Sequence, residues 1–180
     1  LFINFFISLN DYLTTFLFLI GILAFFFFQK IKKKLILDIS LICLITLTLI
    51  YKTNLNNDFG LYHAPYLSIL SSEKIVFGIS NLHFRFGHIS AQQYYEILFS
   101  NLLLKKVSII ICIALLFSSF LFFSIRKFVD NKISLSTVFL SLISIYFFLR
   151  FSRFNEFGND IIPNLLGLYC LYLSIQINQP

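Results

Sequence analysis

The chain has few charged residues, no tryptophan, no methionine and only three cysteines. Charged residues make up 12% of its 180 residues, while 58% are hydrophobic and the mean hydropathy is +0.87. Because soluble globular domains carry about 25% charged residues, this composition excludes an ordinary soluble domain. Cys43, Cys112 and Cys170 each lie in an apolar run without the spacing of a metal or redox motif, which indicates small core residues.

Long apolar runs take up most of the sequence. Each is roughly 15–18 residues long, near the short end of what crosses a ~30 Å hydrocarbon core. We therefore predict an all-α protein, a polytopic transmembrane helical bundle of about five spans, as one domain over residues 1–180. Because methionine is absent and residues 1–9 are apolar, we also expect a piece of a longer protein that starts with the tail of a severed helix. The five runs are Tyr12–Phe28, Leu35–Tyr51, Val107–Ser124, Ile133–Leu149 and Ile161–Ile175.

The net charge of +6 does not indicate a nucleic-acid partner. The basic residues concentrate in two short connectors, Lys30–Lys34 and Arg126–Lys132, and no basic helix with interleaved aromatic residues is present. Basic short connectors are typical of the cytoplasmic side of a membrane protein. We therefore expect no nucleic acid and an integral protein of the lipid bilayer, in a bacterial inner membrane, with residues 52–106 and 150–160 on the extracytoplasmic side.

The predicted outer loop, residues 52–106, has helical signals of its own. Pro65 suits the first turn of a helix, and Ser90-Ala91-Gln92-Gln93 has the pattern of a capping box. Between them, Asn81–Gly87 has the composition of a turn. We predict two short helices lying on the membrane surface, with tyrosines of the second one at the interface.

All three histidines fall in this loop, close to the other polar residues. Asp58 could act as a general base toward a substrate hydroxyl, or could be an ordinary turn residue. His63 could assist proton transfer, bind a phosphate or cap the following helix. His83 and His88 are weaker candidates for the same chemistry. The composition would allow a metal site built from these four residues, but none of them has the spacing of a metal motif, so we predict no cofactor.

Arg85 is the strongest candidate for binding a ligand in the loop. It stands between Phe84 and Phe86, and a guanidinium held between aromatic rings can grip phosphate with two hydrogen bonds. The alternative is an ion pair with a carboxylate such as Glu73.

A second polar segment, residues 150–160, is expected on the same side of the membrane. Arg153, Glu156 and Asp160 could form ion pairs that hold a helix end, or Arg153 could bind a donor phosphate. Two predicted spans separate this segment from the first loop, so both lie on one side of the membrane and face each other there.

Two signatures in these segments resemble a known group of membrane proteins. The first is Asp58-x-x-x-Tyr62-His63-x-Pro65 followed by Asn81-Leu82-His83-x-Arg85-Phe86-Gly87, and the second is Arg153-x-x-Glu156-x-Gly158-x-Asp160. Together they resemble a bacterial group similar to the dolichyl-phosphate-mannose-protein mannosyltransferase class of GT-C glycosyltransferases. The resemblance covers roughly residues 50–165.

The resemblance implies an enzyme that moves a sugar from a polyprenyl-phosphate carrier to an acceptor on the extracytoplasmic face. It implies Asp58 and His63 as catalytic residues, and it implies substrate binding by Tyr62, Asn81, His83, Arg85, Arg153, Glu156 and Asp160. Two features depart from the pattern: at least two apolar runs precede Asp58, and Asn57-Asp58 stands in place of paired acids. A transporter and a lipid-linked glycan polymerase or ligase remain as alternatives.

Overall fold

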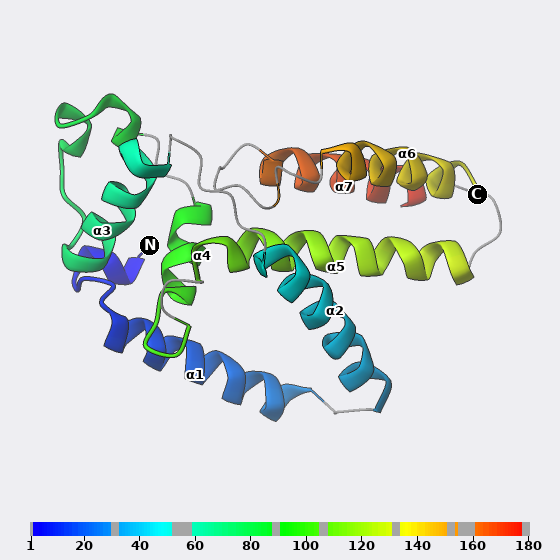
Figure 1. Cartoon of the computed structure of the whole chain (residues 1–180), viewed down its shortest axis with the longest axis horizontal. Coiled ribbons are helices and arrows are strands. Elements are labelled where there is room, and N and C mark those ends of the chain that lie inside the picture. Colours follow the sequence, from blue (N-terminus) through cyan, green and yellow to red (C-terminus); the bar gives the residue numbers. More distant parts are fainter. Residues whose placement is uncertain are drawn as a thin grey trace.

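The computed structural model describes residues 2–29, 33–51, 59–87, 91–104, 108–130, 134–150, 154 and 161–177, and every regular element in these ranges is helical. Five long helices and two short ones form the architecture shown in Figure 1. The long helices are α1 (Asp11–Phe28), α2 (Lys33–Tyr51), α5 (Ser108–Asp130), α6 (Leu135–Leu149) and α7 (Ile161–Ile177). The short helices are α3 (Ala64–Ser72) and α4 (Ala91–Phe99).

Helix α5 is the centre of the larger core. Ile113 and Phe117 are completely buried there, and they pack with residues of α2, α6 and α7. The ring of Phe154, which follows α6, stacks on Phe117 at a centroid distance of 3.7 Å. Phe154 also meets Phe147 of α6 edge to face. The core therefore joins α6 and α7 to the face of α5 along most of its length (Figure 1).

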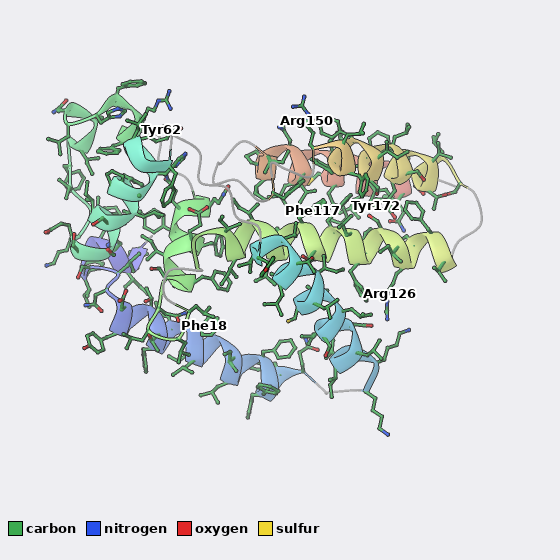
Figure 2. All side chains as sticks on the ribbon, in the orientation of Figure 1. Phe18, Tyr62, Phe117, Arg126, Arg150 and Tyr172 are labelled. Carbon is green, nitrogen blue, oxygen red and sulfur yellow. The ribbon has the colours of Figure 1, made fainter. Side chains whose placement is uncertain are left out.

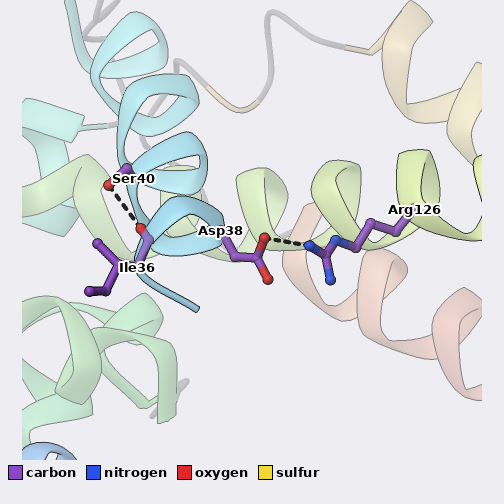
Figure 3. A network of polar contacts seen from close by, with 4 residues as sticks. All are labelled: Ile36, Asp38, Ser40 and Arg126. Carbon is purple, nitrogen blue, oxygen red and sulfur yellow. Dashed lines mark hydrogen bonds and ion pairs between the residues drawn. The ribbon is translucent and has the colours of Figure 1, made fainter. Parts of the chain in front are cut away.

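Helices α2 and α5 are antiparallel and have a fixed register. The Thr46 hydroxyl donates to the Ser118 hydroxyl at 3.0 Å, and Asp38 forms an ion pair with Arg126 (Figure 3). The two contacts are eight residues apart on each helix, from Asp38 to Thr46 on α2 and from Ser118 to Arg126 on α5, which corresponds to about 12 Å of helix. The chain directions are opposite. Two polar contacts at this spacing fix how far α2 can slide along α5.

Within the described part of the chain, three helices are long and apolar enough to cross a membrane, namely α1, α2 and the part of α5 from Ile110 to Val129. Half of the α5 window is buried by protein, but only 6% of α1 and 11% of α2 are buried. The predicted helical bundle is therefore confirmed in its helices, and three of the five predicted spans have full length. Helices α6 and α7, with 15 and 17 residues, are apolar but shorter.

A second, smaller core lies at one end of α1 and α5 (Figure 1). Residues 2–9, 59–87 and 91–104, which we call the loop domain, share this core. Tyr66 and Leu70 of α3 pack there against Tyr94 and Ile97 of α4. The two predicted short helices are confirmed, and their placement on a membrane surface stays a prediction. Tyr94, expected at that surface, is buried inside the loop domain instead.

The prediction of a severed helix over residues 1–9 is wrong for the residues described. Phe2–Phe5 forms a single 3₁₀ turn, and α1 starts only after Asn10, whose side chain accepts a hydrogen bond from the Leu13 amide. Asn4 is fully buried and donates to the carbonyl of Glu73, while the amide of Ile75 donates to the carbonyl of Asn4. Asn4 and Leu9 therefore tie this segment to the loop domain, and the segment does not continue a helix. Its other apolar side chains stay exposed, namely Phe2, Ile3, Phe5, Phe6 and Ile7.

Candidate functional site

The first signature begins with an unusual helical turn. Phe59–His63 is a π-helical turn that leads directly into α3. Pro65 occupies the first turn of α3, as predicted, where its missing N–H costs no helical hydrogen bond. His63 stands at the N-cap of α3 without a side-chain capping bond, and it is buried. The rings of Tyr62 and His63 contact each other across this turn at a centroid distance of 4.2 Å.

Four of the predicted site residues come together at one aromatic ring, since His63, His83 and Arg85 all contact Tyr62. The Arg85 guanidinium lies over the Tyr62 ring at 4.3 Å, and the His83 ring stacks on Tyr62 at a centroid distance of 6.2 Å. His83 also contacts Phe84 and Phe86, at 5.1 and 5.3 Å. We call Tyr62, His83, Phe84, Arg85 and Phe86 the aromatic–arginine cluster. It joins the π-helical turn to the 3₁₀ turn Phe84–Gly87, which is 20 residues further along the chain.

The cluster is half open to its surroundings. Phe86 is buried against Tyr66, whereas Arg85 and Phe84 are exposed, Phe84 to 70%. A cation between aromatic faces keeps its orientation through attraction to the ring quadrupoles. The cluster can therefore present a fixed positive charge and flat apolar rings to a ligand.

The conformation of the turn that precedes the cluster depends on one glycine. Gly78 has φ of +77°, and it is followed by the 3₁₀ turn Ile79–Asn81, whose Asn81 amide donates to the Gly78 carbonyl. A Cβ at position 78 would lie 3.3 Å from Nδ2 of Asn81. Asn81 is exposed at this turn, and the turn Ile79–Asn81 lies against the 3₁₀ turn Phe84–Gly87 of the cluster.

The remaining predicted site residues lie outside the described part of the chain. These are Asp58, His88, Arg153, Glu156 and Asp160. The helix ends that flank them are described: the end of α2, the start of α5, the end of α6 and the start of α7 all lie toward the loop domain (Figure 1). Among the described residues, no three His, Cys, Asp or Glu side chains gather as metal ligands.

Glu96 of α4 is a buried acid that the sequence analysis missed. Its side chain is 1% exposed; Oε1 accepts a hydrogen bond from Nε2 of Gln92 at 2.8 Å, and Oε2 has no hydrogen-bond partner among the described residues. Burial raises the pKa of Glu96 to about 8, although the bond from Gln92 acts to lower it. The spacing of Gln92 and Glu96, one helical turn apart, was the available signal, but it does not reveal burial.

Two tyrosines of the loop-domain core, Tyr66 and Tyr94, also have raised pKa values. Burial raises the pKa of Tyr66 to about 12, with a smaller contribution from the nearby Tyr94, and burial also raises the pKa of Tyr94. Both phenols therefore stay protonated over the range in which Glu96 titrates.

The aromatic–arginine cluster and the ion pair between Asp38 and Arg126 lie far apart in the molecule. Figure 2 shows Tyr62 on the loop domain, while Arg126 lies near the far end of α5. Asp38 and Arg126 therefore hold the helices together at a distance from the aromatic–arginine cluster. Sequence analysis assigned Arg126 to a connector after residue 124, but α5 continues to Asp130 and places Arg126 on the helix.

These features define the protein as a helical protein with membrane-spanning potential and a small folded domain at one end of the helices. The chain belongs to the family described as a domain of unknown function, DUF8201, whose model matches residues 1–180. No curated protein and no solved structure matches the chain.

Proposed function

We propose that this protein transfers a sugar from a polyprenyl-phosphate donor to an acceptor at the membrane surface. The observation that carries the proposal is the aromatic–arginine cluster, in which Arg85 lies 4.3 Å over Tyr62 and beside His83. The cluster belongs to a folded domain at the end of apolar helices, and the family resemblance of its residues supports the same reaction.

Arg85 is the residue best suited to the departing phosphate. When the bond between sugar and phosphate breaks, negative charge develops on the phosphate oxygens, and a fixed guanidinium stabilises that charge. Contact with Tyr62 and Phe84 holds the guanidinium in place before the substrate binds. The exposed ring of Phe84 offers an apolar surface to the lipid chain of the donor.

The remaining steps use residues of the two signatures. Asp58 takes the proton from the acceptor hydroxyl as that oxygen attacks the anomeric carbon of the sugar. The buried imidazole of His63 supports the turn beside it. We assign substrate binding to Tyr62, Asn81 and His83 of the first signature, and to Arg153, Glu156 and Asp160 of the second.

The test is transfer from a radiolabelled polyprenyl-phosphate sugar in membranes that contain the full-length protein. We expect Arg85→Ala to lower the transfer rate about 10²–10³-fold, as for other losses of a charge-stabilising group. Asp58→Asn should lower it about 10²–10⁴-fold, as expected for a general base. Lys74→Ala is the matched control, because it removes an exposed cation from the same domain. Undiminished transfer by both Arg85→Ala and Asp58→Asn overturns the proposal.

A further inference from the structure

A cavity of about 160 Å³ lies between α3 and α4, on a different face of α3 from Tyr66 and Leu70. Its wall includes three serines, Ser68 and Ser71 of α3 and Ser100 at the end of α4. Glu96 is part of the same wall. Ala64, Leu67 and Ile97 form the apolar rest of the wall. A wall that combines hydroxyls and an acid with apolar side chains differs from an empty packing defect, which is lined by apolar groups throughout.

Within the described part of the chain, one oxygen of the acid in this wall makes no hydrogen bond. Oε2 of Glu96 is shielded from solvent and has no hydrogen-bond partner among the described residues, although Oε1 is occupied by Gln92. An unsatisfied buried oxygen costs about 1–3 kcal/mol of stability. Glu96 lines the cavity, and a rotation of its carboxyl brings Oε2 to the cavity surface, where a ligand can complete its hydrogen bonding.

The chemistry of the wall selects an uncharged ligand. Because desolvation holds the Glu96 carboxyl protonated at neutral pH, it offers a neutral O–H donor rather than a negative charge. Serine hydroxyls both donate and accept. A cation would have to displace the proton, whereas a ligand hydroxyl can accept from Glu96 and donate to a serine.

The size of the cavity limits the ligand to one ring. A cavity of about 150 Å³ holds a single six-membered ring in other proteins. We propose that the cavity between α3 and α4 is a binding subsite for one pyranose ring, or an uncharged polyol of that size, hydrogen-bonded to Oε2 of Glu96. It rests on the proposed function in one respect, that the ring belongs to the sugar donor or acceptor.

The test uses a reagent that reports on Glu96 without measuring transfer. Dicyclohexylcarbodiimide reacts with protonated carboxyls in apolar surroundings: the acid proton goes to one nitrogen, the carboxyl oxygen bonds to the central carbon, and the adduct rearranges to a stable N-acylurea without loss of atoms. Full-length protein in membranes is treated at neutral pH with and without D-glucose, D-mannose or D-galactose. Peptide mass spectrometry then measures the rate of modification at Glu96.

We expect at least one of the three sugars to slow the modification, about tenfold when the sugar is at about ten times its Kd. Glu96→Gln should abolish the adduct, and Glu73→Gln should leave it unchanged because Glu73 is an exposed carboxyl of the same domain. Ser68→Leu, which fills the cavity from an exposed position on α3, should remove the protection. The proposal is overturned if sodium chloride slows the modification of Glu96 as much as the sugars do. It is also overturned if none of the three sugars slows it.

The two proposals fail in different ways. If a sugar protects Glu96 but transfer does not depend on Arg85 or Asp58, the subsite stands and the transfer reaction does not. If transfer depends on those residues and no sugar protects Glu96, the transferase stands and the subsite does not.

Discussion

Replacement of Glu96 by glutamine should change how the stability of the loop domain depends on pH. The carboxyl has a pKa of about 8 in the folded protein and 4.5 as a free side chain. Between these values the folded state binds a proton that the unfolded state has lost. Stability is therefore fully present below pH 4.5, falls as the pH rises toward about 8, and is constant above it.

The size of this loss follows from the same two values. At about 1.4 kcal/mol for each tenfold change in proton affinity, the gap between 4.5 and about 8 corresponds to roughly 5 kcal/mol. This is an upper estimate, because rearrangement around Oε2 can relieve part of the cost. A loss of even half this size is large compared with the stability of a small domain. Glutamine resembles the protonated acid, so Glu96→Gln should lack the loss.

Hydrogen–deuterium exchange of α3 and α4 measures this effect in the full-length protein. Protection is expressed relative to the intrinsic exchange rate at each pH, and the wild type is compared with Glu96→Gln. The comparison cancels the contribution of every ionisable group that the two proteins share. Cys112 of α5 interacts electrostatically with Glu96, and Cys112→Ser should leave the difference between the two proteins in place. Parallel pH profiles for the wild type and Glu96→Gln would refute a buried, proton-binding Glu96.

Three further substitutions test the packing. Gly78→Ala should lower the stability of the loop domain by about 1–2 kcal/mol, because alanine is strained at φ +77°; exchange of α3 amides measures the loss. Phe154→Ala should destabilise the helix bundle by about 3–5 kcal/mol, because it removes a buried ring stacked on Phe117; chemical unfolding in detergent measures this. Asp38→Arg should weaken the pairing of α2 with α5, and adding Arg126→Asp should restore it; crosslinking of cysteines placed on the two helices detects both results.

For each of these three substitutions, one result would contradict the prediction. A wild-type exchange rate in Gly78→Ala would mean that the turn adopts another conformation. A loss well below about 3 kcal/mol in Phe154→Ala would mean that the ring stacked on Phe117 does not contribute as a buried core residue. Failure of the charge exchange to restore crosslinking would mean that the Asp38–Arg126 pair does not set the register.

The helices could be predicted because their signals are local. Runs of apolar residues, Pro65 and the polar breaks between runs identified α1, α2, α3 and α4 within a few residues. The end of α5 was predicted too early because the apolar run stops at Ser124, while Arg126 and Lys127 can continue a helix and favour its C-terminal end. Local composition therefore identifies a helix better than it identifies the last turn.

The contacts that organise the site are not local, and sequence analysis found them only in part. Tyr62 and Arg85 were both selected, but their contact spans 23 residues of sequence and depends on the π-helical turn. Asp38 and Arg126 are 88 residues apart, and the sequence analysis placed Arg126 in a basic connector rather than on a helix that faces Asp38. Glu96 was missed because an acid in a polar loop is expected to be exposed. Its burial results from the packing of α4 on α3 and α5.

The loop domain also constrains the order in which the protein assembles. Its core includes Leu9 and is tied to Asn4, although these residues are separated from α4 by the whole of α1 and α2. Leu9 can reach Tyr94 and Ile97 only after α4, which begins 82 residues later at Ala91, has been made, and contacts of long sequence separation form slowly. The domain is therefore the last part of this region to form during synthesis. Until then, the amide of Ile75 and the carbonyl of Glu73 lack the partners that Asn4 later supplies.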